Sequence, residues 1–410
     1  MFFHKVSLQI LALCSFHLAS SSPTHNVKLL PKPSGPFDVA INTMELIDHG
    51  RLDPFAPTNT SRRMMVSAVY PVENSHSNCR YPYMPPFTAK TEDEIFSFLP
   101  AGSYESLFLQ VGCSSKPLAD APLVLFSPAQ GNNRLDYGLI ASNVASYGFT
   151  VITMDHPYIA DLVEFSDGSY ILAAPITAIN LQEIIAEGTA AIVVQAQDTS
   201  FVLDQLANKT LLHQLIPGRT CELDASSVAM FGHSFGGATA AVAMVNDTRI
   251  KGGVDMDGAV FNASDTLDVG FDRPFLFFSH QNDTRFYNGT DLGDDFSAET
   301  WSALWSALTG WKLELELDHS LHYSFSDFPS QLETLGVRLP AVELVTLLSG
   351  NDTDIPAEAV QGIADSLLEA QRGMHAVVSY VVAFMEFVLK GKVEGLLCGP
   401  SERFPEVTFI

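Results

Sequence analysis

Basic residues are scarce in this 410-residue chain. Lys and Arg number 22 against 47 Asp and Glu, which gives a formal net charge of −25 at pH 7. A chain this acidic repels phosphate, so we expect no nucleic-acid partner and no charge-driven attachment to anionic membranes. Charged residues as a whole are also few, at 17%, whereas apolar residues reach 47% and aromatic residues 10%. This composition excludes a disordered acidic tail and indicates a packed globular protein.

Long apolar runs are lacking as well. A membrane-spanning helix needs about 20 consecutive apolar residues. Residues 1–22 hold one lysine, a shorter apolar run and a small-residue exit, an order typical of a secretory signal peptide cleaved near Ser21. The segment His375–Leu389 is apolar but is interrupted by Glu386, so we expect a packed helix there and no transmembrane segment.

Cysteine is rare, and the common metal-binding patterns are missing. None of the five cysteines stands in a Cys-x-x-Cys spacing, and the chain has no His-Glu-x-x-His motif. We therefore expect neither a metal site nor another cofactor. Cys14 leaves with the signal peptide, so the mature chain keeps an even number. Three pairings into two disulfides are possible, and we favour Cys79–Cys113 with Cys221–Cys398 because the first pair is close in sequence.

Sequons for N-glycosylation are frequent, which indicates a secreted protein. Asn-x-Ser/Thr occurs at Asn59, Asn208, Asn246, Asn262, Asn282, Asn288 and Asn351. Two of these sequons, at Asn262 and Asn282, fall near the rim of the expected active site. Together with the signal peptide and the even cysteine count, the sequons predict a secreted, extracellular glycoprotein with disulfide bonds.

Short apolar runs alternate with longer helical patterns from about residue 120 onward. Continuous apolar runs are typical of strands buried on both faces, as in a parallel sheet. We expect strands at 122–127, 149–154, 227–231, 252–256 and 274–278, and helices at 135–146, 179–206, 236–245, 298–308 and 357–392. This alternation predicts a doubly wound α/β fold with helices on both faces of a mostly parallel sheet. The strictly alternating run 311–317 predicts a strand with one wet face near a sheet edge.

The domain organisation is simple. We expect a signal peptide at 1–22 and a single domain over 23–410, because no repeat or low-complexity segment divides the chain. Residues 23–60 contain six prolines and predict an extended lead-in to that domain. The pair Arg62-Arg63 directly precedes a strand-like run, so a structural role is favoured over a processing site.

One motif indicates nucleophilic chemistry. Gly232–Gly237 reads GHSFGG, follows the strand expected at 227–231 and opens a small-residue helix. A Gly-x-Ser-x-Gly motif in a strand–turn–helix context places its serine on a strained, exposed turn at the start of a helix. Ser234 is therefore the candidate nucleophile. His233 beside it is expected to pack, because adjacent side chains on such a turn diverge.

A serine nucleophile needs a histidine base and a carboxylate that orients the base, and both follow later in the chain in this kind of fold. His319 ends the last expected strand, whereas His322 lies inside the following loop and is the preferred base. For the acid, Asp283 follows the seventh strand, the more usual place, but lies inside a sequon. Asp255 and Asp257 follow the sixth strand, and alternation puts both on the same side. Asp257 is nearer the carboxyl end of its strand, where sites gather in open α/β sheets.

Two backbone N–H groups are expected to stabilise the oxyanion. One belongs to Phe235, the residue after the nucleophile. The other should come from the loop after the strand at 122–127, where Pro128 has no N–H and Gln130 is the better donor.

The chain resembles the secreted platelet-activating factor acetylhydrolases, particularly their fungal relatives. The resemblance runs from about Asp53 to Lys392. It is carried by FSPAQG at Phe126–Gly131, DHPY at Asp155–Tyr158, VEFSDG at Val163–Gly168, GHSFGG at Gly232–Gly237, VDMDG at Val254–Gly258 and HYSFSDF at His322–Phe328.

This resemblance implies an α/β-hydrolase fold and calcium-independent hydrolysis of a short acyl ester at the sn-2 position of a phospholipid. In the family the triad acid follows the sixth strand, which favours Asp257 over Asp283, and the second oxyanion donor matches Gln130. Relatives often carry His-Gly where this chain has Pro128-Ala129, a difference that reshapes the expected acyl pocket.

We therefore expect a secreted serine esterase acting on short-acyl phospholipids, with transient contact to a lipid surface. A general carboxylesterase or a cutinase-like polyesterase is the alternative within enzymes. A hydrolase-fold binding protein without activity is the alternative outside them, and the intact Ser234, His322 and candidate acids argue against it.

Overall fold

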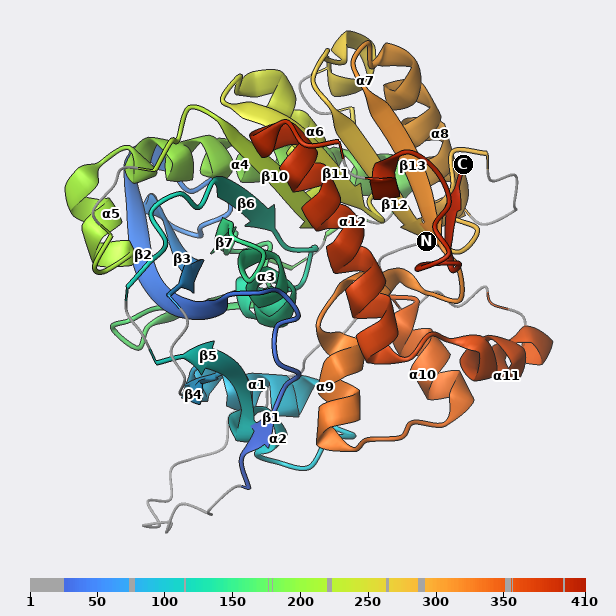
Figure 1. Cartoon of the computed structure of the whole chain (residues 1–410), viewed down its shortest axis with the longest axis horizontal. Helices are drawn as coiled ribbons and strands as arrows, with labels where there is room; N and C mark the ends of the chain where they lie inside the picture. The colour runs from blue at the N-terminus through green and yellow to red at the C-terminus, as the bar shows by residue number, and fades with distance from the viewer. Residues whose placement is uncertain are drawn as a thin grey trace.

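The computed structural model describes residues 26–73, 78–113, 116–175, 177–178, 180–219, 223–262, 265–286, 292–350, 355, 357–393 and 395–410. Its centre is a twisted nine-stranded sheet in the order β14-β13-β12-β11-β10-β6-β7-β3-β2 (Figure 1). These strands are β2 (Asp38–Leu52), β3 (Ser61–Val72), β6 (Leu123–Ser127), β7 (Thr150–Met154), β10 (Val228–His233), β11 (Ile250–Met256), β12 (Phe275–His280), β13 (Lys312–Leu317) and β14 (Val407–Phe409). The six strands β7, β6, β10, β11, β12 and β13 run parallel, whereas β3, β2 and β14 pair antiparallel at the two edges. The expected mostly parallel α/β-hydrolase sheet is confirmed.

Two hydrophobic cores cover the two faces of this sheet, because successive side chains of each buried strand point to opposite sides. In β6, Val124 and Phe126 join the core under α3 (Gly138–Ala145) and α12 (Ala370–Lys390). Leu123 and Leu125 join the opposite core. That second core lies under α4 (Leu181–Leu206), α6 (Phe235–Asn246) and α8 (Leu292–Ala307). Burial on both faces explains why these strands read as unbroken apolar runs.

Helix α12 crosses one face of the sheet (Figure 1). Among the described residues it is the one helix long and apolar enough to span a membrane, and 67% of its apolar window is buried inside the molecule. Its buried side contacts β10, β11 and α3. The segment expected to be a packed surface helix is therefore a largely buried core helix that packs on the sheet.

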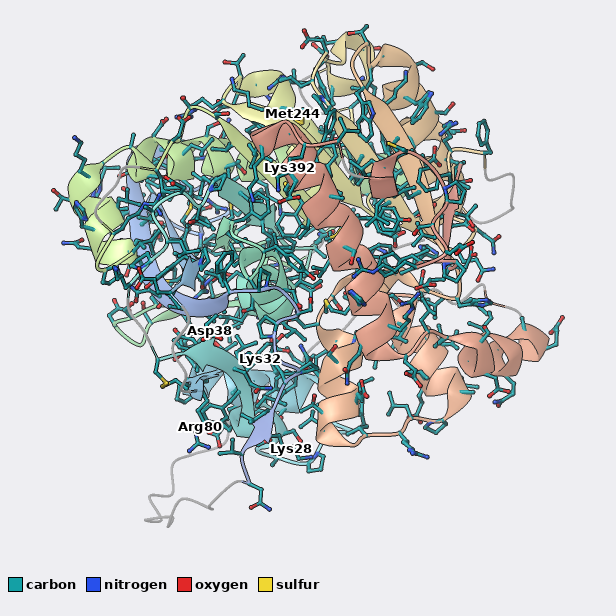
Figure 2. All side chains as sticks on the ribbon, in the orientation of Figure 1. Lys28, Lys32, Asp38, Arg80, Met244 and Lys392 are labelled. Atoms are coloured by element: carbon teal, nitrogen blue, oxygen red, sulfur yellow. A yellow bond between two sulfur atoms is a disulfide. The ribbon has the colours of Figure 1, made fainter. Side chains whose placement is uncertain are left out.

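The Pro-rich lead-in contributes more structure than the sequence predicts. Residues 38–52 form β2, a 15-residue strand that pairs with β3 at one edge of the main sheet. Lys32 and Asp38 form an ion pair at 3.3 Å just before this strand (Figure 2). Residues 28–29 form β1 in a second, three-stranded sheet with β5 (Leu107–Gly112) and β4 (Asn78–Pro82).

The remaining elements are short. They are α1 (Pro86–Ile95), α2 (Ser103–Ser106), β8 (Leu162–Glu164), β9 (Tyr170–Leu172), α5 (Lys209–Leu215), α7 (Thr266–Val269), α9 (Phe328–Leu335), α10 (Ala341–Leu348) and α11 (Ala357–Ser366). In the described part of the chain, 3-10 helices lie at Arg134–Tyr137, His322–Phe325 and Gly395–Leu397. The single helical segment expected at 357–392 is therefore two helices, α11 and α12.

Strand β13 departs from the expected alternation of a wet and a dry face. Glu314 on that strand is only 1% exposed. Its carboxylate binds Arg285 as an ion pair and accepts a 3.0 Å hydrogen bond from the Arg285 backbone N–H. Strand β14 pairs with β13, so β13 is the second strand from the edge of the sheet.

A disulfide joins Cys79 to Cys113, the first of the two favoured pairs, and links β4 to the end of β5. Cys221 lies outside the described residues, so the pairing of Cys221 with Cys398 stays a prediction. The predicted signal peptide at 1–22 and the sequons at Asn288 and Asn351 also lie outside the described residues.

Candidate active site

Ser234 stands on a sharp turn between β10 and α6. Its backbone has φ 55° and ψ −122°, a conformation that residues other than glycine rarely adopt. A Cβ on Gly232 would lie 2.2 Å from the carbonyl carbon of Gly236, and a Cβ on Gly236 would lie 1.9 Å from the carbonyl oxygen of Ser127. Only glycine fits these two positions, so the motif is a packing requirement of the turn.

The turn is fixed to the neighbouring strand by its backbone. The Ser234 N–H donates to the carbonyl oxygen of Met256 at 2.8 Å. Met256 ends β11, and Asp257 follows it directly. Gly258 packs so closely on the Ser234 carbonyl that an added Cβ would lie 2.1 Å from that oxygen. The serine and the residues after β11 therefore share one corner of the sheet.

His322 and Asp257 meet at this corner. Nδ1 of His322 lies 2.6 Å from Oδ2 of Asp257, and the Asp257 carboxylate is fully buried. Burial alone would raise the pKa of this carboxyl, but His280 and His322 outweigh burial and hold the pKa well below its usual range. Asp257 is therefore an anion at neutral pH, and it orients the imidazole of His322.

The competing residues lie elsewhere. His319 is exposed in a left-handed backbone conformation, and its N–H donates to the side chain of Gln281 at 2.9 Å. Asp283 lies near a different histidine, with Oδ2 3.9 Å from Nδ1 of His280. Asp255 is buried beneath the turn, where its Oδ1 accepts the N–H of Gly258 at 3.0 Å. Burial and the nearby Asp257 charge raise the pKa of Asp255 well above its ordinary value.

His280 is a site residue that the sequence analysis missed. It ends β12, and its Nδ1 lies 2.7 Å from Oδ1 and 2.9 Å from Oδ2 of Asp257. Its backbone N–H donates to Oδ1 at 2.7 Å. Asp257 is thus held by two imidazoles. No pattern in the sequence marks this histidine, because it looks like the polar end of an ordinary strand.

His233 is buried and takes part in a hydrogen-bond chain that joins two loops. The Ala129 N–H donates to the Tyr137 hydroxyl at 3.3 Å, and that hydroxyl lies 2.8 Å from Nδ1 of His233. Nε2 of His233 then donates to the carbonyl oxygen of His322 at 2.9 Å. Burial, with His322 nearby, lowers the pKa of His233 well below its ordinary value, so the ring is neutral and structural.

The loop after β6 offers one free backbone donor among its described residues. The Ala129 N–H is used by Tyr137, the Gly131 N–H donates to Ile159 at 3.0 Å, and the Asn132 N–H donates to Ala129 at 3.2 Å. Gln130 makes no recorded hydrogen bond through its N–H. The Phe235 N–H is the first of α6, and first-turn N–H groups have no partner within the helix.

Three groups of side chains bring metal-ligand atoms within 4.8 Å of one another in the described part of the chain. Two of these groups share Asp257, one with His233 and His322 and one with His280 and Asp283, and in both its carboxylate is already hydrogen-bonded to a histidine. The third is Glu92 with Asp136 and Asp161.

The third group is hydrogen-bonded internally. Asn133 donates its side-chain N–H to Glu92 at 3.3 Å and to Asp161 at 3.2 Å, and its backbone N–H to Asp136 at 3.1 Å. Burial raises the pKa of all three carboxyls, and the increase is larger for Glu92 and Asp136 than for Asp161. A raised pKa favours the protonated form, and protonation lowers the repulsion between neighbouring carboxyls.

The sequon asparagines that the structure describes all lie on the surface. Asn59, Asn208, Asn246, Asn262 and Asn282 are exposed. Asn208 caps α5, with its side-chain oxygen accepting the N–H of Thr210 at 3.0 Å. Asn282 adopts a left-handed conformation at the end of β12, close in sequence to His280. The side chains are accessible, as glycosylation would require.

Comparison with known proteins places the chain among esterases. Residues 190–337 match the family described as "Platelet-activating factor acetylhydrolase, isoform II". The chain is 34% identical to a "Probable 1-alkyl-2-acetylglycerophosphocholine esterase" of Arthroderma benhamiae over 98% of both chains. It is also 27% identical to the platelet-activating factor acetylhydrolase of Cavia porcellus, over 40% of this chain and 42% of that protein.

A solved structure agrees with the sequence matches. The ferulic acid esterase from Streptomyces cinnamoneus superposes with a TM-score of 0.72 at 27% identity, covering 93% of this chain and 99% of that one. The full-length match at 34% identity, the esterase fold and the corner that joins Ser234 to Asp257 and His322 all point to hydrolysis of ester bonds. The chain belongs to the platelet-activating factor acetylhydrolase family of α/β-hydrolases.

Proposed function

We propose that the protein is a serine esterase that removes a short acyl group from the sn-2 position of a phospholipid such as platelet-activating factor. In this proposal Ser234 is the nucleophile, His322 the general base and Asp257 the acid. The 2.6 Å contact between His322 and the buried Asp257, at the corner that holds the strained Ser234, is the observation that carries the proposal.

The geometry assigns each group one step. Asp257 accepts the Nδ1 hydrogen of His322, which leaves Nε2 to take the proton of the Ser234 hydroxyl as that oxygen attacks the ester carbonyl. The oxyanion that forms is stabilised by the backbone N–H groups of Phe235 and Gln130. His322 then returns the proton to the departing lysophospholipid oxygen, and an acyl-serine remains.

Water completes the cycle. His322 removes a proton from a water molecule that attacks the acyl-serine, and the resulting tetrahedral oxyanion is held by the same two N–H groups. Its collapse releases the short carboxylic acid and returns the proton to Ser234. Apart from substrate and water, every step uses groups of this chain. His322 releases each proton that it takes up.

The substrate is tested by comparing esters on wild-type protein and on Ser234→Ala. The panel is a 1-alkyl-2-acetyl phosphocholine lipid, the same lipid with a long sn-2 chain, and 4-nitrophenyl acetate. We expect kcat/KM for the acetyl lipid to exceed that for the long-chain lipid by about 100-fold or more. An acetyl lipid turned over no better than 4-nitrophenyl acetate would contradict the lipid assignment and leave the esterase.

A second candidate rests on the solved structure. The ferulic acid esterase matches nearly the whole fold at 27% identity, which favours a broader carboxylesterase acting on small aromatic esters. Methyl ferulate in the same panel separates the two candidates. Turnover of methyl ferulate above that of the acetyl lipid would favour the second.

Secretion is part of the proposal. It is supported by the disulfide between Cys79 and Cys113, which is stable in oxidising compartments, and by the exposed sequon asparagines. Expression of the full chain in a eukaryotic host should yield extracellular protein that begins near Ser21 and loses mass on treatment with an N-glycosidase. Retention of the intact N-terminus inside the cell would contradict secretion.

A further inference from the structure

A second Ser–His–Asp chain lies under the loop that follows β6. The Ser127 hydroxyl is 2.9 Å from Nε2 of His156, and Nδ1 of His156 is 2.9 Å from Oδ2 of Asp198. All three residues are buried, with exposed fractions of 0%, 1% and 0%. A substrate cannot reach Ser127, so this chain of hydrogen bonds does not form another nucleophilic site.

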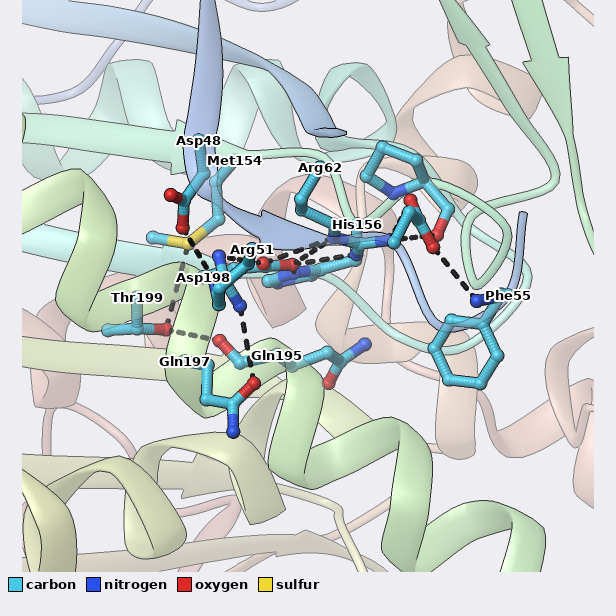
Figure 3. A network of polar contacts seen from close by, with 12 residues as sticks. Asp48, Arg51, Phe55, Arg62, Met154, His156, Gln195, Gln197, Asp198 and Thr199 are labelled. Atoms are coloured by element: carbon cyan, nitrogen blue, oxygen red, sulfur yellow. Dashed lines mark hydrogen bonds and ion pairs between the residues drawn. The ribbon is translucent and has the colours of Figure 1, made fainter. Parts of the chain in front are cut away.

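A buried arginine keeps the carboxylate of this hydrogen-bond chain ionised. Arg62 donates to Asp198 from Nη2 at 2.7 Å and from Nε at 3.2 Å (Figure 3). Its Nη1 also donates to Asp53 at 2.8 Å and to the carbonyl oxygen of Pro157 at 2.9 Å. Burial would raise the pKa of Asp198, but Arg62 and His156 outweigh burial and hold the pKa well below its usual range.

The ionised Asp198 sets the direction of the hydrogen bonds. A carboxylate can only accept, so Nδ1 of His156 carries the hydrogen. In the neutral ring Nε2 then accepts the hydroxyl hydrogen of Ser127. Figure 3 shows Arg62 and His156 on the same carboxylate, that of Asp198. Each partner in this chain has a fixed role, so the side chain of Ser127 has one orientation.

The segment 155–159, which follows β7, contacts the loop after β6 and its flanking residues at three points. His156 binds Ser127, the last residue of β6. The Ile159 carbonyl oxygen accepts the N–H of Gly131 at 3.0 Å. Asp155 accepts the backbone N–H of Arg134 at 2.7 Å and forms a buried ion pair with its guanidinium. Gln130, the proposed oxyanion donor, lies between these points.

Arg134, at the end of the loop, is held by a second contact. The Nε of Arg134 donates to the Ser67 hydroxyl at 2.8 Å, which ties the end of the loop to β3. The carbonyl oxygen of Ser127 lies so close to Gly236 that no Cβ fits there. The beginning of the loop therefore packs against the first turn of α6, where Phe235 offers the other N–H.

We propose that Asp155, paired with Arg134, and His156, anchored through Asp198, position the loop 128–133 so that the Gln130 N–H points at the developing oxyanion. The inference deepens the proposed function and rests on it, because it concerns the same oxyanion. Stabilisation of this kind depends on donors placed before the reaction, and loss of one donor costs about 10²- to 10³-fold in kcat. These residues are positioning residues, since none touches the substrate.

The test compares Ser127→Ala with Thr150→Val as a matched control. Both changes remove one buried hydroxyl, but Thr150 lies at the opposite, amino-terminal end of β7, where its hydroxyl contacts Ala121. We expect Ser127→Ala to lower kcat by about 10- to 100-fold with KM nearly unchanged, because a displaced donor loses part of its effect. Thr150→Val should keep kcat within about twofold of wild type.

Binding of a trifluoromethyl ketone gives a readout that a merely structural role would not move. Its tetrahedral adduct on Ser234 places an oxyanion where the donors point. The inhibition constant should rise for Ser127→Ala by the same factor by which kcat/KM falls. It should stay constant for Thr150→Val. Arg134→Lys, which keeps the charge beside Asp155 but loses the bond to Ser67, should behave like Ser127→Ala and serves if that variant does not fold.

Two results are decisive against the inference. The inhibition constant and kcat of both loop variants could equal those of Thr150→Val. Alternatively, Thr150→Val could also show a lower kcat and a higher inhibition constant, in step with its melting temperature. If Ser234→Ala is inactive in the same assays, either result overturns only the positioning role. Activity retained in Ser234→Ala would instead overturn the proposed function.

Discussion

His280 contacts Asp257 through both its backbone and its ring. The backbone N–H and Nδ1 each lie 2.7 Å from Oδ1, while His322 binds the carboxylate at Oδ2. The acid of the proposed triad is therefore fixed from the end of β12 as well as from the turn after β11. Two ring contacts on one buried carboxylate leave it little freedom to rotate.

Replacing His280 should weaken catalysis without abolishing it. His280→Leu removes the ring donor, so we expect kcat to fall by about tenfold to a hundredfold, because Asp257 would then be held less firmly against His322. His280→Asn places an amide near the former Nδ1 and should recover part of the loss. Steady-state kinetics on 4-nitrophenyl acetate measures both. Equal activity of the two variants and wild type would show that His322 alone fixes the acid.

One pair of isosteric substitutions tests whether Asp257 or Asp283 is the acid of the triad. Asp257→Asn keeps the shape but no longer fixes the tautomer of His322, so we expect kcat to fall by about 10⁴-fold. Asp283→Asn should change kcat by less than about tenfold, because Asp283 pairs with His280 at 3.9 Å, whereas Asp257 contacts His322 directly at 2.6 Å. A larger loss in Asp283→Asn than in Asp257→Asn would reverse the assignment.

The turn around Ser234 should not tolerate a methyl group. In Gly236→Ala the new Cβ would lie 1.9 Å from the Ser127 carbonyl oxygen, and backbone atoms cannot move aside cheaply. We expect a loss of at least about 3 kcal/mol in the free energy of unfolding and no measurable turnover. The control is Gly362→Ala on α11, where nothing lies within 4 Å of the added Cβ. Urea unfolding compares them, and a stable, active Gly236→Ala would contradict the packing described for this turn.

Asp327 predicts a pH dependence of stability. Its carboxylate accepts the N–H groups of Leu139 and Ile140 at 2.6 and 3.0 Å and the Tyr83 hydroxyl at 2.9 Å. Burial nevertheless raises the pKa of Asp327 to about 7. In the unfolded chain the pKa is about 3.9, so the folded state binds the extra proton between these values.

The stabilisation from this proton is present below about pH 4 and is lost as the pH rises to about 7. In Asp327→Asn this contribution is absent at every pH. Wild-type stability relative to Asp327→Asn should therefore decline between about pH 4 and 7 and stay level above that range. Chemical unfolding at four pH values measures the difference, and a difference that grows with pH would refute the assignment.

Sequence patterns predict the buried framework and the turn that holds the candidate nucleophile, because both depend on local rules. Continuous apolar runs mark β6, β7 and β10, and glycines that admit no Cβ mark the turn at Ser234. The edge strand β2 was read as part of a lead-in, because a half-exposed edge strand needs no continuous apolar run.

The acid and its supports were harder to foresee for physical reasons. Alternation placed Asp255 and Asp257 on one side, but β11 ends at Met256 and Asp257 turns into a left-handed conformation with φ 64°, so the two carboxylates separate. His280 and Asp198 reach their partners from strands and helices distant in sequence. Such contacts depend on tertiary packing and leave no local pattern.

Covalent labelling of Ser234 tests the central claim most directly. Wild-type protein and Ser234→Ala are incubated with a fluorophosphonate, and intact mass and peptide mapping are recorded alongside circular dichroism. The account predicts one adduct per wild-type chain on the peptide that contains Ser234, and none on a folded Ser234→Ala. An unlabelled wild type, or equal labelling of the two proteins, would contradict it.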